Sequence, residues 1–84
     1  MSHEDLQEAV RGRPFVPFRL LVSTGISFDI RHPDQIAVER RSVLIGVTQE
    51  LDGVPIHRDV RIDLLQVVAI EVSPTLGAGT NGMS

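Results

Sequence analysis

The first residues of the chain have the apolar spacing of a short helix. Ser2 and Asp5 are spaced as in a capping box, with Asp in place of the usual Glu, and an apolar stripe follows at Leu6, Ala9 and Val10. Gly12 stands where a C-cap belongs, and Pro14 prevents the helix from continuing. A helix of about two to three turns is not stable alone in water, so we expect it to pack on a sheet.

From Phe18 onward apolar residues recur at every second position, which is the period of half-buried strands. The loop from Ser23 to Gly25 separates two such strands, and its glycine is placed for a left-handed conformation. The resulting register brings apolar residues together on one face, pairing Val22 with Ile26, Leu20 with Phe28 and Phe18 with Ile30.

A second hairpin is expected around Asp52 and Gly53, which form a strong signal for a two-residue turn. Before it, the segment from His32 to Asp34 interrupts the alternation and indicates a bend, and the segment from Arg40 to Ser42 indicates a charged turn. Centring the register on the two-residue turn pairs Val47 with Arg58, Ile45 with Val60 and Val43 with Ile62.

The end of the chain combines a helical turn, a strand and a tail. Two adjacent leucines between Asp63 and Gln66 fit a single helical turn, and Val68, Ile70 and Val72 then alternate as a last strand. We expect one domain over residues 1–73 and a flexible tail of glycine and small polar residues over 74–84. Deleting that tail should leave the denaturation midpoint unchanged.

These elements predict a mainly β fold with one N-terminal helix, built as a small antiparallel β-barrel or curled sheet of the Sm or SH3 type. The alternative is an open sheet backed by the helix. Phe28→Ala should cost about 3–5 kcal/mol, because Phe28 shares the phase of the apolar face. The residues expected to be mostly buried are Leu20, Val22, Ile26, Phe28, Ile30, Val38, Ile45, Val60, Ile62, Val68 and Ile70.

Composition limits the class of protein. A chain of 84 residues, 42% hydrophobic and 23% charged, has room for one domain with a thin core and little volume for a deep active site. It contains no cysteine, which excludes disulfides, zinc ribbons and thiol nucleophiles. The start is acidic and the apolar runs have strand length, so we expect neither a signal peptide nor a membrane span. The expected location is the cytoplasm.

The charge of the chain is weakly negative and unevenly distributed. The formal net charge is −3, and all eight basic residues are arginines. Residues 11–61 hold these arginines together with only six acidic residues, whereas the first ten residues are acidic. A net acidic chain lacks the overall field that drives non-specific binding to nucleic acid, although a local arginine cluster could hold a phosphate.

Several motifs are spread along the chain: Pro14, Phe15, Pro17, Phe18 and Arg19, the strand to Gly25, His32 and Pro33, and the closing Asp63, Leu64, Leu65, Val68, Ile70 and Glu71. With these motifs the chain resembles a group of short, uncharacterised bacterial proteins over about residues 4–72. That resemblance implies no activity. The topology also resembles the Sm-like barrel of bacterial RNA chaperones, which implies a fold but not RNA binding. The chain departs from that barrel by one additional strand, and it has Arg61, Ile62 and Asp63 where the chaperone has a Tyr, Lys, His stretch.

The sequence holds no glycine-rich phosphate loop, paired acidic signature or nucleophile elbow. The histidines His3, His32 and His57 lie on different expected elements, and none has a second ligand at metal spacing. His32 with Asp34 is the nearest approach to a catalytic dyad. The simpler interpretation is that Asp34 caps the turn after Pro33 while His32 lies at the surface. We predict no catalytic residue, no metal and no cofactor.

Two candidate binding surfaces remain. An arginine patch could hold phosphate, carboxylate or RNA because guanidinium groups bind these anions bidentately, although Glu39 and Asp59 would partly neutralise it. Its members are Arg40, Arg41, Arg58 and Arg61. Phe15 and Pro17 could form a partner surface. The simpler interpretations are a solvated charged face for the arginines and, for Phe15, a plug at one end of the core.

These expectations favour a small non-enzymatic module that contacts a protein partner or a second copy, forming a homo-oligomer by edge-strand pairing. The alternative is an Sm-like RNA or nucleotide binder that uses the arginines. That alternative is weakened because the chain has no tryptophan or tyrosine on which bases could stack. A hydrolase that uses His32 and Asp34 is a third hypothesis.

Overall fold

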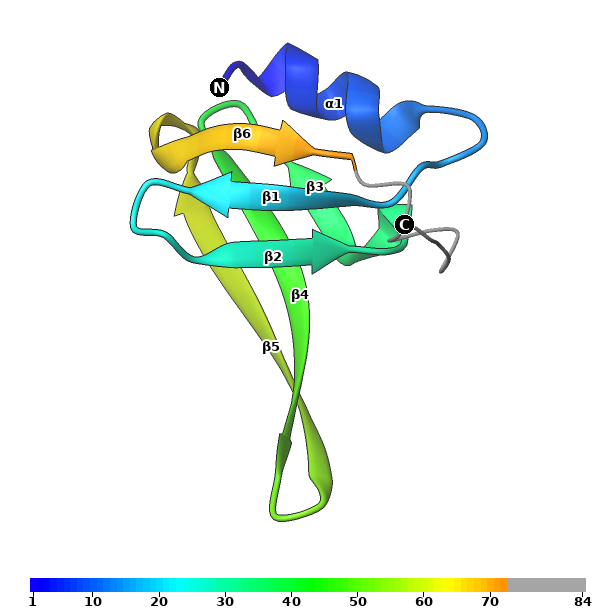
Figure 1. Cartoon of the computed structure of the whole chain (residues 1–84), viewed down its shortest axis with the longest axis vertical. Coiled ribbons are helices and arrows are strands. Elements are labelled where there is room, and N and C mark those ends of the chain that lie inside the picture. The colour runs from blue at the N-terminus through cyan, green and yellow to red at the C-terminus, as the bar shows by residue number, and fades with distance from the viewer. Residues whose placement is uncertain (73–84) are drawn as a thin grey trace, which may run out of the picture.

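A computed structural model describes residues 1–72, which form one helix and two three-stranded antiparallel sheets (Figure 1). The first sheet has the strand order β2-β1-β6 and the second has the order β3-β4-β5. In chain order the elements are α1 (His3–Arg11), β1 (Phe18–Val22), β2 (Ser27–Ile30), the 3-10 turn η1 (Pro33–Gln35), β3 (Ile36–Val38), β4 (Ser42–Leu51), β5 (Val54–Asp63), the 3-10 turn η2 (Leu64–Gln66) and β6 (Val67–Glu71).

The expected fold class is confirmed in its main statement, a mainly β chain with one N-terminal helix. Among the described residues no backbone ladder joins the two sheets, so a closed barrel is not confirmed. The expected tail over 74–84 lies outside the described residues. No helix within residues 1–72 is long and apolar enough to cross a membrane.

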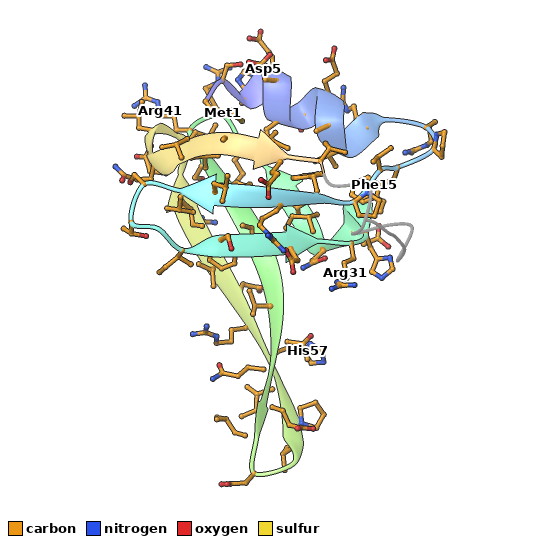
Figure 2. The ribbon with its side chains drawn as sticks, viewed as in Figure 1. Met1, Asp5, Phe15, Arg31, Arg41 and His57 are labelled. Carbon is orange, nitrogen blue, oxygen red and sulfur yellow. The ribbon has the colours of Figure 1, made fainter. Side chains whose placement is uncertain are left out.

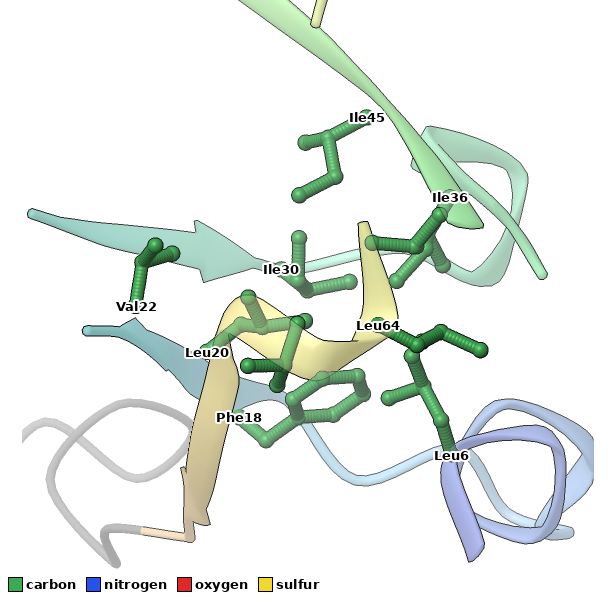
Figure 3. Close-up of a cluster of buried hydrophobic side chains, with 10 residues drawn as sticks. Leu6, Phe18, Leu20, Val22, Ile30, Ile36, Ile45 and Leu64 are labelled. Atoms are coloured by element: carbon green, nitrogen blue, oxygen red, sulfur yellow. The ribbon is translucent and has the colours of Figure 1, made fainter. Parts of the chain in front are cut away.

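The N-terminal helix forms as its capping signal predicts. The backbone N–H of Asp5 donates to Ser2 Oγ at 3.2 Å, and Gly12 is the C-cap. Leu6 on the inner face of α1 is fully buried, because it inserts into the cluster formed by both sheets (Figure 3). The helix therefore gains its stability from packing.

Both predicted hairpins are confirmed in register. Phe18 pairs with Ile30 and Leu20 with Phe28, and the loop between β1 and β2 contains Gly25 at φ +93°. The second ladder runs without interruption from the pair Ser42 and Asp63 to the pair Leu51 and Val54. Its turn residues Asp52 and Gly53 both have positive φ, at 54° and 79°, which is the pattern of a type I′ turn.

The core lies between the two sheets and beneath α1 (Figure 3). Its fully or almost fully buried residues are Leu6, Phe18, Leu20, Val22, Ile30, Ile36, Val43, Ile45, Leu64 and Val67. Of the residues expected to be buried, four are in this set, and five are half-buried: Phe28, Val38, Val60, Ile62 and Ile70. The expectation was wrong for Ile26 and Val68, which are exposed.

The two errors have different physical causes. Ile26 precedes the first residue of β2, an edge strand, and so lies beyond the part of the sheet that covers the core. In β6 the register with β1 shifts between Leu21, which pairs with Ala69, and Val22, which pairs with Val67. This irregularity inserts one extra residue and moves Val68 out of the inward phase, so that Val67 is buried in its place.

The register shift in β6 predicts opposite effects for two adjacent valines. Val67 is 2% exposed and Val68 is 60% exposed, so Val67→Ala should lower the free energy of unfolding by about 1–3 kcal/mol while Val68→Ala changes it by less than about 0.5 kcal/mol. Urea unfolding followed by far-UV circular dichroism measures both. A larger cost for Val68→Ala would contradict the register of β6.

The outer face of the first sheet carries a network of opposite charges. Arg19 lies opposite Asp29 on β2 and Glu71 on β6, and its Nε is 2.8 Å from Asp29 Oδ1. The hydrogen bond to Asp29, with the charge of that carboxylate, raises the pKa of Arg19 above its ordinary value. The charged side chains at the centre of this face therefore pair with one another.

Candidate interaction surfaces

The most prominent surface feature is a two-stranded arm. The outer halves of β4 and β5 extend beyond β3 and beyond the first sheet, and they form one end of the long axis of the molecule (Figure 1). We refer to residues 47–58 as the arm. Every residue from 48 to 57 is exposed. A two-stranded ribbon with no third strand is only marginally stable by itself in water. The arm is longer than is needed to connect β4 to β5, so its length calls for an explanation other than connecting two strands.

The two faces of the arm differ in character. Because the ladder is uninterrupted and side chains alternate, the face that buries Val43 and Ile45 inside the body continues along the arm. We call this continuation the apolar face; it consists of Val47, Leu51, Val54 and Ile56 with Gln49 and Arg58. Leu51, Val54 and Ile56 are 49%, 58% and 37% exposed. The core pattern of the sheet thus extends into solvent with no described residue to cover it.

The opposite face of the arm is polar. Thr48 lies across from His57, and Thr48 Oγ1 and His57 Nδ1 are 3.2 Å apart. Figure 2 labels His57 on the arm. Glu50 lies across from Pro55 next to the turn. The arm is therefore amphipathic across its thickness, with one face suited to solvent and the other to a partner.

The structure separates the four arginines that were candidates for an anion site. Arg61 is paired with Glu39 at 3.4 Å, and Arg58 lies opposite Val47 on the apolar face of the arm. Arg40 and Arg41 are neighbours in the turn between β3 and β4 and form no ion pair with any residue in 1–72. Only this pair is left as a joint cationic feature.

Arg40 and Arg41 lie on the wall of an open hollow of about 430 Å³. We call it the basic hollow; its walls include Met1, His3, Arg40, Arg41, Asp63 and Leu65. The Met1 ammonium donates to the carbonyl oxygens of Leu64 at 3.1 Å and Val67 at 3.3 Å, which holds the start of the chain against η2. Asp63 is already engaged, because its Oδ1 accepts from the Leu65 N–H at 2.9 Å. The side chain of Leu65 is 83% exposed, so the hollow joins a cationic rim to an apolar wall.

Phe15 and Pro17, the other expected partner surface, are both half-buried. The Phe15 ring lies 6.0 Å from the buried Phe18 ring, measured between centroids, and packs on the core. The apolar residue of this segment that faces solvent is Val16, at 51% exposure. The packing of Phe15 therefore favours a role in closing one end of the core.

His32 and Asp34 are both exposed and lie at the 3-10 turn η1. His32 lies on the wall of a second hollow, of about 480 Å³, whose lining does not include Asp34. The expected surface position of His32 is confirmed, but the expectation that Asp34 caps this turn was wrong, since the N-cap of η1 has no side-chain hydrogen bond and the Asp34 carboxylate forms none within residues 1–72. Gln35 holds the bend instead, because its amide accepts from Arg31 N–H and donates to the Asp29 carbonyl, both at 2.9 Å. Within residues 1–72 no three His, Asp or Glu side chains are grouped as metal ligands.

Sequence reasoning missed the apolar face of the arm and the basic hollow. The first had a visible signal, because alternation around Asp52 and Gly53 extends well beyond the length of the neighbouring strands. The second had none, since the hollow assembles residues from the start of the chain, the β3–β4 turn and η2.

Comparison with known proteins does not indicate a function for these surfaces. No protein-family model, curated protein or solved structure matches the chain.

Proposed function

We propose that this chain is a small non-enzymatic interaction module that associates with further copies of itself through the apolar face of its β4–β5 arm. The observation that carries the proposal is that the apolar face of β4 and β5 continues from the buried core into solvent, at Leu51, Val54 and Ile56. The cytoplasmic location that we expect from the absence of cysteine belongs to the same proposal.

Energetics support a covered arm. Fully burying a valine, leucine or isoleucine side chain contributes about 1.5–3 kcal/mol. Leu51, Val54 and Ile56 are exposed in the monomer, so a partner that covers them would gain a large part of that free energy for each. They lie together at the end of one ribbon, which distinguishes them from isolated exposed apolar residues elsewhere on the surface. A partner surface that covers the arm also orders a ribbon that is marginal alone.

The face of the arm is better suited to association than the outer edge of β5. The outer edge of β5 includes Pro55, which has no backbone N–H to donate. It also includes Arg58, Asp59 and Arg61, whose charges alternate in sign. Proline and charge are devices by which proteins prevent edge-to-edge pairing. We therefore place the contact on the apolar face and not on a β5 edge ladder, in contrast to the edge-strand pairing expected from the sequence.

The alternative, an Sm-like RNA or nucleotide binder, receives support from the order of elements, a helix first and a 3-10 turn before the last strand. It receives less from the arginines. RNA binding needs several cations on one face, because each phosphate contact contributes separately to affinity. Arg58 lies on the arm and Arg61 is paired with Glu39, which leaves two of the four arginines together.

The proposal is tested by solution mass as a function of concentration. We expect a mass above that of the 9.2 kDa monomer, and we expect it to rise with concentration. Analytical ultracentrifugation with interference optics measures this mass, because a chain without tryptophan or tyrosine absorbs too little near-ultraviolet light. Leu51→Thr with Ile56→Thr places β-branched threonine, which favours strands, at both positions but removes apolar area, and should weaken association about 10-fold or more.

The matched control lies on the polar face of the arm at similar depth. Thr48→Ser with His57→Gln should leave the association constant within about 3-fold of the unchanged protein, since neither side chain belongs to the apolar face. A chain that stays monomeric up to its highest soluble concentration would overturn the proposal, as would equal weakening by the two pairs of substitutions.

A further inference from the structure

We infer that the surface that receives the arm is the basic hollow of a second copy, into which the arm inserts its tip. This inference rests on the proposed function and names the partner and the receiving site. By tip we mean residues 50–54, which carry the apolar Leu51 and Val54 beside two carboxylates.

The tip and the hollow are complementary in charge. Glu50 and Asp52 give the tip two negative charges, and residues 48–57 contain no arginine or lysine to offset them. The hollow presents Arg40 and Arg41, whose guanidinium groups form no ion pair with another residue in the described part of the chain. Guanidinium and carboxylate groups pair bidentately, so each arginine has a suitable acceptor on the tip.

The two surfaces also match in their apolar parts. The hollow places the exposed Leu65 next to the arginines. The tip carries Leu51 and Val54 on its apolar face, Glu50 on its polar face and Asp52 in the turn between them, so an inserted tip presents both kinds of side chain to the walls. A volume of about 430 Å³ accommodates a few side chains but not a whole element. A hairpin tip with two apolar and two acidic side chains fits this size and this distribution of polarity.

The occupant must come from another molecule. The arm tip and the helix end of the body lie at opposite ends of the long axis (Figure 1), and the Arg41 and Met1 side chains of the hollow lie at the helix end (Figure 2). The chain extends 36 Å along that axis. The arm cannot fold back into its own hollow while its ladder with the body is intact, so the complementary pair is an intermolecular one.

Reversing the charges tests the inference. Arg40→Glu with Arg41→Glu, and separately Glu50→Arg with Asp52→Asn, should each raise the dissociation constant for self-association about 10-fold or more at low salt. Asparagine is chosen at position 52 because it tolerates the positive φ of that turn residue. All four substitutions in one chain set one positive charge on the tip against two negative charges in the hollow, and should bind at least about 3-fold more tightly than the Arg40→Glu with Arg41→Glu variant.

The control applies the same charge change away from the hollow. Arg13→Glu with Arg31→Glu alters two arginines that do not line it and should leave association within about 3-fold. Far-UV circular dichroism checks that each variant is folded. If a glutamate variant fails to fold, Arg40→Gln with Arg41→Gln replaces it, with the same expected direction.

Disulfide cross-linking tests whether the tip of one copy lies next to the hollow of another, independently of the charge substitutions. Because the chain contains no cysteine, His3→Cys in the hollow of one protein and Val54→Cys on the tip of another can be mixed and oxidised. The expected product is the disulfide between the two different variants. Homodisulfides alone would overturn the inference.

The outcomes separate this inference from the proposed function. If the dissociation constant for self-association is unchanged by the substitutions at positions 40 and 41, the tip-to-hollow contact is overturned but the arm remains the proposed interface. A monomeric chain overturns both. Retention of single-stranded RNA that is lost in the Arg40→Gln and Arg41→Gln variant, with no change in solution mass, overturns the inference in favour of RNA binding at the hollow.

Discussion

Replacing Phe18 with alanine should destabilise the fold by about 3–5 kcal/mol, the range for removing a fully buried phenylalanine side chain. Phe18 is 0% exposed and belongs to the cluster where α1, the first sheet and η2 meet (Figure 3). The total stability of a small domain is about 5–15 kcal/mol, so the loss is a large fraction of it. Urea unfolding followed by far-UV circular dichroism measures the difference at equal protein concentration, since association contributes to apparent stability.

The matched control is Phe28→Ala. Phe28 is half-buried, so we now expect the substitution to cost less than Phe18→Ala and less than the roughly 3–5 kcal/mol expected from the sequence. The order of the two costs is the informative result. Equal costs would mean that Phe28 is covered to the same degree, by the body or by a second copy.

Shortening the arm should abolish self-association and leave the body folded. The variant deletes residues 48–51 and 54–57 and closes the ladder with Asp52 and Gly53 between Val47 and Arg58. Val47 and Arg58 have the same place in the ladder alternation as the present closing pair, Leu51 and Val54, so the type I′ turn still fits. Solution mass should equal that of the shortened monomer at every concentration.

The shortened chain also tests whether the arm supports the body. Because every deleted residue is exposed, the free energy of unfolding of the monomer should change by less than about 1 kcal/mol. A folded variant that still associates would place the interface on another surface. A variant that unfolds would show that the arm is required for the stability of the body.

Local chemistry explains why the hairpins could be predicted. Asp52 and Gly53 adopt the positive φ that a two-residue turn requires, and Gly25 does so in the first loop. With the turn located, a period of two decides which residues pair, as in Val47 with Arg58 and Phe18 with Ile30. The helix likewise follows from its cap at Ser2 and its stop at Pro14.

Burial could not be predicted in the same way, since it depends on what lies opposite a residue. Ile45 and Ile56 occupy the same face of the same ladder, yet Ile45 is fully buried and Ile56 is exposed. The difference is that the first sheet covers the inner half of the ladder and no described residue covers the outer half. In β6 the register shift against β1 exchanged Val67 for Val68, and nothing in the local alternation marks that shift.

The sequence by itself determined the helix, the two hairpins with their registers, the turn at Arg40 and Arg41 and the helical turn after Asp63, because each depends on a few adjacent residues and a regular period. Only the tertiary structure decided that the β4–β5 ladder outreaches the body, and that Met1, Arg41 and Leu65 meet around one hollow. The physical reason is that both features arise from packing between segments far apart in the chain, which no local pattern records.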